Sequence, residues 1–178
     1  MSPDDVLTFW RDAGPDRWFS KDETFDATIR ARFLPYYEAA ARGGLDRWTS
    51  QPDGALALLI LLDQFPRNIF RGQKRAFAAD SLARAVAATA LASGYDRRCE
   101  TVLRQFFYLP FMHSERLDDQ DRCLRLYENM GDEALLKYAR EHRSIIARFG
   151  RFPHRNALLG RQSSAEEQAF LDSGGFGG

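Results

Sequence analysis

The sequence lacks the features that mark exported, membrane-spanning and disulfide-stabilised proteins. Residues 1–5 have neither the basic residues nor the apolar run of a signal peptide, and the longest apolar run, residues 55–62, is far too short to cross a bilayer. The two cysteines, Cys99 and Cys123, have neither the number nor the spacing of a disulfide framework or a zinc knuckle. We therefore expect a cytoplasmic protein with no membrane partner, in which both cysteines are small packing residues.

Motifs of the common enzyme classes are also missing. There is no glycine-rich phosphate loop, no Gly-x-Ser-x-Gly elbow and no His-Glu-x-x-His. His113-Ser114-Glu115 matches half of a zinc deaminase signature, but no Pro-Cys-x-x-Cys follows it. Arginine and phenylalanine alternate over residues 148–152, as in some proteins that stack nucleobases, yet a net charge of zero and a pI near 6.8 argue against a nucleic-acid partner. The sequence indicates no particular cofactor.

What is present is an apolar pattern with the period of the α-helix. It predicts an all-α protein of seven to eight antiparallel helices, either a tetratricopeptide-like array of stacked helical hairpins or an irregular bundle. The predicted helices cover about residues 3–10, 22–42, 52–65, 79–93, 100–107, 116–130, 132–149 and 164–171. Prolines are expected to kink or split the second helix at Pro35 and to end the third before Pro66 and the fifth before Pro110. We expect a single helical domain over residues 1–172 and a disordered, glycine-rich tail over 173–178.

Charge is unevenly distributed along this neutral chain. Residues 142–165 contain no carboxylate, but they carry five arginines and two of the three histidines. Such a stretch produces a local positive field that needs a negative partner. The partner is either an internal acid, for example in the run Glu115, Asp118, Asp119 and Asp121, or an anion from outside. The sequence leaves both open.

Two similar turns hold much of the remaining polar chemistry. Phe65-Pro66-Arg67-Asn68 is echoed by Phe152-Pro153-His154-Arg155-Asn156, each after an apolar helix. In the simpler interpretation Asp63 pairs with Arg67, and the cations offset the helix dipole. In the other, Arg67, Arg71 and Arg155 converge to grip a phosphate or carboxylate.

A second group of residues follows the apolar turn at Pro110. His113 and Glu115 come directly after five large apolar side chains, which favours burial of this region. A buried histidine beside a carboxylate can act as a general base, and His142 and His154 could complete a set of metal ligands. The alternative is a hydrogen-bonded network that ties the loop to the core. Trp18 lies in a predicted loop, where it either covers a pocket or staples two helices.

Several of these motifs occur together in a known family. They are the segment Val6 to Trp10, Trp18-Phe19 with Phe25-Asp26, Asp63-Gln64-Phe65-Pro66-Arg67-Asn68, Tyr108-Leu109-Pro110 with His113-Ser114-Glu115, and His142 through Asn156. In this order, over about residues 4 to 171, they resemble the bacterial DUF924 family. The resemblance implies a fold similar to tetratricopeptide-like helical repeats and a family with no established activity. The chain departs from the family at Trp10-Arg11, where the family often has Trp-Phe.

Three functional hypotheses follow. The first is a site for an anionic small molecule or peptide. Its candidate residues are Asp63, Arg67, Asn68, Arg71, His142, Arg151, His154, Arg155 and Trp18. The second is an acid–base or metal-assisted hydrolytic enzyme that uses His113 and Glu115 with His142 or His154; no metal ligand set is assigned. The third is a scaffold that binds another protein, in which these charges only hold the structure together.

Overall fold

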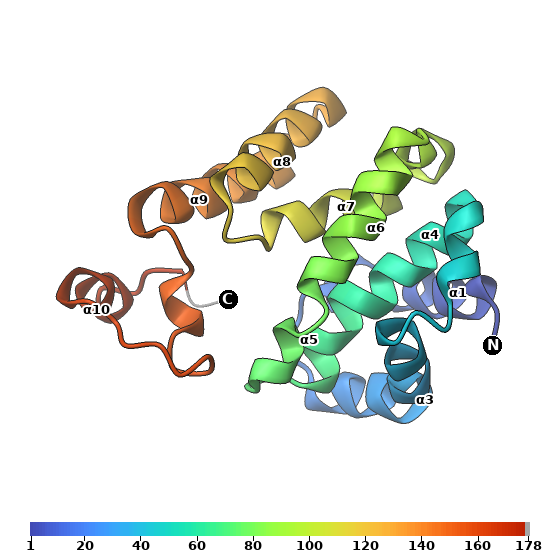
Figure 1. Cartoon of the computed structure of the whole chain (residues 1–178), viewed down its shortest axis with the longest axis horizontal. Helices are drawn as coiled ribbons and strands as arrows, with labels where there is room; N and C mark the ends of the chain where they lie inside the picture. The colour runs from blue at the N-terminus through green and yellow to red at the C-terminus, as the bar shows by residue number, and fades with distance from the viewer. Residues whose placement is uncertain (177–178) are drawn as a thin grey trace. The chain divides into compact units, whose positions relative to one another are not determined.

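The computed structural model describes residues 1–176, and all regular structure within them is helical, with no strand (Figure 1). The chain forms two compact units, an N-terminal unit, Met1–Pro110, and a C-terminal unit, Phe111–Gly178. The predicted all-α class is therefore confirmed. The single domain over residues 1–172, the disordered tail and the tetratricopeptide-like repeat stay predictions, and residues 177–178 of the tail lie outside the described residues.

The N-terminal unit contains most of the helices. They are α1 (Pro3–Ala13), α2 (Pro15–Trp18), α3 (Glu23–Ala41), α4 (Pro52–Leu59), α5 (Phe65–Ile69), α6 (Asp80–Ala92) and most of α7 (Thr101–Met112), with 3-10 turns at Asp46–Ser50, Lys74–Phe77 and Tyr95–Arg98. Ser2 and Asp22 begin α1 and α3, because their side chains accept hydrogen bonds from the first free backbone amides of each helix. No described helix is long and apolar enough to span a membrane.

The core of this unit is aromatic. Trp10 is fully buried, and its ring lies 5.4 to 6.2 Å from the rings of Trp18, Phe25, Phe65 and Phe106. The Trp18 Nε1 donates a hydrogen bond of 2.6 Å to the carbonyl oxygen of Trp10. Trp18 is itself buried and fastens α2 to α1, and its assignment to a ligand site stays a prediction.

Two helices continue through prolines that were expected to end them, and those two predictions are wrong. A π-helical turn, Ile60–Gln64, joins α4 to α5, so one helix runs from Pro52 past Pro66 to Ile69. A proline ring collides with the carbonyl group four residues earlier in an α-helix, and the wider π turn changes that geometry. Pro110 lies in the last turn of α7; it lacks the amide that would donate to the carbonyl of Phe106, and only two residues of the helix follow it. Pro35 does not split α3.

The C-terminal unit contains the end of α7, then α8 (Leu117–Met130), α9 (Glu133–Phe149), a 3-10 turn at Pro153–Arg155 and α10 (Ala165–Asp172). Helices α8 and α9 pack along each other, joined by Gly131, whose φ of 76° suits glycine (Figure 1). Ser164 begins α10 with the predicted capping box. With α4 and α5 taken as one helix and the four-residue α2 set aside, the described residues form eight helices, as the sequence predicted.

Candidate functional site

The first group of predicted site residues forms an N-terminal polar cluster, which we define as Asp26, Asp63, Arg67, Asn68, Arg71 and Asp80. Its centre is Arg67 on α5. The Arg67 guanidinium lies 3.3 Å from a carboxylate oxygen of Asp63 and donates hydrogen bonds of 3.1 and 3.2 Å to both carboxylate oxygens of Asp80 on α6. The Asp63–Arg67 pair is the one the sequence indicated. Asp63 belongs to the π turn, and its carboxylate is therefore within reach of Arg67 on α5, the helix that follows.

The other half of this cluster ties α5 to α3. Arg71 donates two hydrogen bonds, of 2.6 and 2.9 Å, to the two carboxylate oxygens of Asp26, and Asn68 donates a third of 2.8 Å to the same carboxylate. Asp26 is 8% exposed and Asn68 is 4% exposed. The Arg71–Asp26 hydrogen bond is also the main reason that the pKa of Arg71 is raised. Asp26 is thus held in a nearly buried position by three hydrogen bonds.

The charge balance of the N-terminal polar cluster does not favour an anionic ligand. Burial alone would lower the pKa of Arg67, but the charges of Asp63 and Asp80 outweigh it, so the pKa is raised. Three carboxylates face two guanidinium groups. A phosphate or carboxylate at this place would therefore meet guanidinium groups that are already bonded to carboxylates.

The second group forms a C-terminal polar cluster, defined as Glu115, Arg151, Arg155, Asn156, Arg161 and Glu167. Glu115 follows α7, and its carboxylate accepts two hydrogen bonds from Arg161, of 2.7 and 2.9 Å, and one of 2.9 Å from the backbone amide of Phe152. Burial would raise the pKa of Glu115, but the hydrogen bonds from Arg161 and Phe152 and the nearby positive charges outweigh it and lower the pKa. Glu115 is therefore an ionised carboxylate at neutral pH, fixed between two segments.

The same cluster attaches α10 to the segment after α9. Arg151 donates two hydrogen bonds, of 2.6 and 2.8 Å, to the carboxylate of Glu167, which is only 3% exposed. Asn156 donates a weaker one of 3.4 Å to the same carboxylate. The Arg151 hydrogen bond is the main reason that the pKa of Glu167 is lowered to about 2, with the backbone amide of Ser164 contributing.

The histidines lie beside this cluster. The Arg155 Nη1 donates a hydrogen bond of 3.0 Å to the backbone carbonyl of His113, and the guanidinium carbon lies 4.5 Å from the centre of the Phe152 ring. Burial, together with the charge of Arg155, lowers the pKa of His154 to about 4, so its ring is neutral at pH 7. The Nδ1 of His142 lies 2.8 Å from the carbonyl oxygen of Tyr138, one turn earlier on α9.

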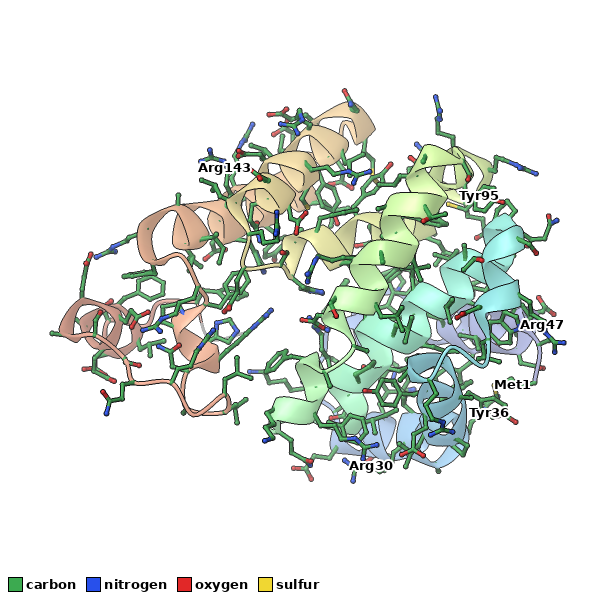
Figure 2. The ribbon with its side chains drawn as sticks, viewed as in Figure 1. Met1, Arg30, Tyr36, Arg47, Tyr95 and Arg143 are labelled. Carbon is green, nitrogen blue, oxygen red and sulfur yellow. The ribbon has the colours of Figure 1, made fainter. Side chains whose placement is uncertain are left out.

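The negative partners of the carboxylate-free stretch are internal acids. Four of its five arginines form ion pairs, with separations of 2.5 to 2.8 Å: Arg143 with Asp121, Arg148 with Glu166, Arg151 with Glu167 and Arg161 with Glu115. Arg143 is labelled in Figure 2. Two of the four acids, Glu115 and Asp121, belong to the run that the sequence offered. The other two begin α10, immediately after the stretch.

Sequence reasoning did not find several members of the two clusters. Asp26, Asp80, Asn156, Arg161 and Glu167 were not proposed as site residues. Four of them bond residues that were, and Asn156 bonds Arg161 and Glu167. Asp26 and Asn156 lie in the motifs shared with the family, Arg161 belongs to the carboxylate-free stretch and Glu167 lies at the start of the last predicted helix, whereas no sequence signal marked Asp80.

The predicted convergence of Arg67, Arg71 and Arg155 would join residues of two different units, and it stays a prediction. Within residues 1–176 no three His, Cys, Asp or Glu side chains are grouped so that they could hold a metal ion. The acid–base roles of His113 and Glu115 stay predictions.

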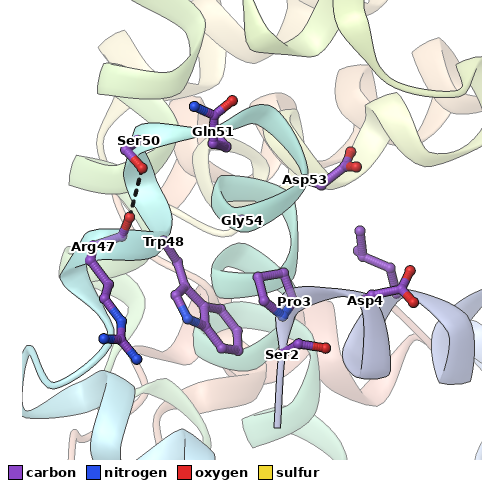
Figure 3. A pocket seen from close by; sticks show the side chains of 10 residues that line it. Ser2, Pro3, Asp4, Arg47, Trp48, Ser50, Gln51, Asp53 and Gly54 are labelled. Atoms are coloured by element: carbon purple, nitrogen blue, oxygen red, sulfur yellow. Dashed lines mark hydrogen bonds between the residues drawn. The ribbon is translucent and has the colours of Figure 1, made fainter.

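A pocket of about 320 Å³ lies elsewhere in the N-terminal unit, between the first turns of α1 and α4 and the 3-10 turn Asp46–Ser50 (Figure 3). Its lining is Ser2, Pro3, Asp4, Leu7, Arg47, Trp48, Ser50, Gln51, Asp53 and Gly54. None of these is a predicted site residue. At Gly54 a β-carbon would lie 2.2 Å from the carbonyl oxygen of Trp48, so only glycine allows this close approach.

The chain is thus an all-helical protein with two polar clusters, each of which pairs arginines with carboxylates of its own unit. It belongs to the family described as "Bacterial protein of unknown function (DUF924)", whose sequence profile matches residues 6–175. It is similar to the solved structure of ATU0120, a protein of unknown function from Agrobacterium tumefaciens, with a TM-score of 0.93 and 46% sequence identity over 96% of this chain and 97% of that chain. A comparison with curated proteins gave no match.

Proposed function

We propose that the protein is an interaction scaffold, a helical framework that binds another protein and uses its Arg, His and acidic residues to hold its own helices together. The observation that carries this proposal is the internal pairing of the arginines that a ligand site would need. Arg67, Arg71 and Arg151 each make at least two hydrogen bonds or ion contacts to carboxylates of their own unit.

This pairing supports a structural role because each contact joins elements that are distant in sequence. Asp26 fastens α5 to α3, Asp80 fastens α5 to α6, and Glu167 fastens α10 to the segment that follows α9. A buried ion pair that loses one partner leaves an uncompensated charge, at a typical cost of about 3–5 kcal/mol. Loss of one of these arginines should therefore lower the stability of the fold, whether or not an outside ligand is present.

The two competing hypotheses make different demands. An anion would have to displace a bonded carboxylate in order to reach Arg67, Arg71 or Arg151. A proton donor needs a carboxyl group that is protonated near neutral pH, whereas the pKa of Glu115 is lowered. The anion hypothesis is tested by the same experiment as the scaffold proposal.

The experiment compares the single substitutions Arg67→Ala and Arg151→Ala with Arg125→Ala. Arg125 is exposed on α8 and serves as a matched control for the loss of one positive charge. Thermal unfolding followed by circular dichroism is measured for each, with and without 10 mM sulfate or phosphate at constant ionic strength, a concentration chosen as roughly tenfold above a weak millimolar Kd.

We expect the two cluster variants to unfold at clearly lower temperature than Arg125→Ala, and we expect the anions to give the unsubstituted protein no more stabilisation than they give the variants. The scaffold proposal is wrong if Arg67→Ala or Arg151→Ala melts like Arg125→Ala but loses an anion-dependent stabilisation that the unsubstituted protein shows. In that case the clusters are ligand sites.

A further inference from the structure

The chain leaves α10 along a defined path. The backbone amides of Ser173, Gly174 and Gly175 donate hydrogen bonds of 3.0 to 3.1 Å to carbonyl groups of the last turns of α10. Gly174 has a φ of 79°, the left-handed conformation that ends many helices and favours glycine. These bonds direct the following residue, Phe176, back toward the C-terminal unit.

Gly175 permits a very close approach on this path. A β-carbon at this position would lie 2.5 Å from the carbonyl oxygen of Phe170 and 2.6 to 2.7 Å from carbons of the Phe170 ring. No residue with a side chain fits without displacing backbone. Gly174 is thus favoured by its positive φ, and Gly175 by the close approach to Phe170. Both indicate that the sequence specifies this course of the tail.

The tail ends, within the described residues, with an aromatic ring packed against other rings. The centre of the Phe176 ring lies 4.5 Å from that of His142 and 5.3 Å from that of His154, both edge to face. It also packs against the small apolar core that contains Phe152, whose ring lies 5.7 Å from His142 and 5.6 Å from His154. We define the rings of His142, Phe152 and His154 as the aromatic site. Its walls come from α9 and from the turn that follows it.

The aromatic site suits a neutral ring. Edge-to-face packing of aromatic rings contributes beyond the burial of their area. The Nδ1 of His154 is buried and makes no hydrogen bond within the described residues, and the pKa of this ring is lowered mainly by burial, so the ring is neutral at pH 7. One side of Phe152 is already covered by the guanidinium of Arg155. The contacts that Phe176 makes are contacts to the rings of this site and to the apolar core of Ile145, Ile146 and Phe152, all of which a phenylalanine of another chain can make equally well.

We propose that the aromatic site is the place where this scaffold binds its partner, that the partner supplies an aromatic side chain flanked by small residues, and that Phe176 occupies the site as a built-in competitor. The proposal rests on the proposed function as a scaffold and names the chemistry of its partner. The occupant seen in the structure, a phenylalanine preceded by two glycines, is the pattern for the partner segment. Because the tail is tethered beside the site, it competes at an effective concentration in the millimolar range. A free partner segment displaces the tail only when its concentration and affinity together outweigh those of the tail.

The test uses the full chain with the substitution Phe176→Ala and, as probe, a synthetic peptide with the sequence of residues 172–178. The imidazole resonances of His113, His142 and His154 are followed by NMR during titration with the peptide. We expect the peptide to shift His142 and His154 but not His113, and to bind the Phe176→Ala chain about tenfold more tightly than the unsubstituted chain, whose own tail competes. A peptide with alanine in place of phenylalanine is the matched control and should not bind.

A second measurement shows whether Phe176 lies in the site at all. Removal of its ring should expose His154, and because burial is the main cause of the lowered pKa, the pKa should rise from about 4 toward its ordinary value of 6.5. The proposal is overturned if the imidazole resonances do not change in Phe176→Ala, if the peptide does not bind that chain, or if the unsubstituted chain binds it equally well. Since Phe176 is outside both polar clusters, these outcomes are independent of the stability test of the scaffold.

Discussion

The ion pair between Glu115 and Arg161 gives the sharpest test of how the C-terminal polar cluster stabilises the fold. Arg161→Ala removes four hydrogen bonds, two to Glu115, one of 3.0 Å to the side-chain oxygen of Asn156 and one of 3.2 Å to the carbonyl of Phe152. A typical hydrogen bond contributes a net of about 1 kcal/mol. Since the two side chains are 24% and 28% exposed, solvent screens part of this, and we expect a loss of about 2–3 kcal/mol.

A double-mutant cycle separates the pair from its surroundings. Glu115→Gln removes the charge but keeps an oxygen that accepts from the Phe152 amide, and Arg161→Ala is combined with it. We expect a coupling free energy of about 1–2 kcal/mol between the two positions, measured by urea denaturation followed by circular dichroism at pH 7. Arg125→Ala, at an exposed position of α8, should change stability by less than about 0.5 kcal/mol. A coupling energy no larger than that control would refute the structural role of the pair.

The ion pair between Glu115 and Arg161 also predicts how the stability of the fold depends on pH. The pKa of Glu115 is lower in the folded chain than its ordinary 4.5, so the unfolded chain binds more protons in this range. The stability from this group is fully present above pH 4.5 and is lost as the pH falls through the lower, folded value. The free-energy difference between the unsubstituted chain and Arg161→Ala should therefore shrink on acidification below pH 4.5. A difference that stays constant down to pH 3 would contradict the assignment.

Three further outcomes follow. Because the pKa of Glu167 is lowered to about 2, stability should fall as the pH decreases from about 4.5 toward 2, and Arg151→Ala should flatten this part of a stability–pH curve measured by urea denaturation. Gly54→Ala should destabilise the protein by about 1–3 kcal/mol through its clash with the Trp48 carbonyl, although helix propensity alone predicts a gain, so the sign measured by denaturation decides between the two. Cys123 is fully buried and burial raises its thiol pKa, so it should react with iodoacetamide only on unfolding, as mass spectrometry of the labelled peptide can show.

The sequence predicted the helices well because local signals and the buried pattern agree. Ser2, Asp22 and Ser164 cap helices within one residue of the predicted starts, and the apolar spacing along residues 132–149 and 116–130 placed α9 and α8 within one or two residues. The errors came at Pro66 and Pro110. The low helix propensity of proline predicted a break there, but the helix continues because apolar residues on both sides of the proline are buried. Packing of the apolar residues decided the outcome.

The polar clusters were less predictable, and the reason is distance along the chain. Asp63 and Arg67 are four residues apart and were correctly paired from helix geometry alone. Asp26 and Arg71 are 45 residues apart, and Glu115 and Arg161 are 46 apart. No periodicity joins positions so far apart, so the sequence showed that a positive stretch needs negative partners and could supply only a short list of them.

The π turn at Ile60–Gln64 makes the helix that contains it sensitive to changes in its length. Each residue of an α-helix advances about 100° around the axis. Deletion of one residue from the turn would restore regular winding and rotate everything after it, so the side chains of Arg67 and Asn68 would leave the acids of α6 and α3 that they now meet. A point substitution in the turn removes one contact, whereas the deletion of one residue would rotate all of α5 about its axis. We therefore expect natural relatives to vary in residue type within this turn far more readily than in the number of residues it contains.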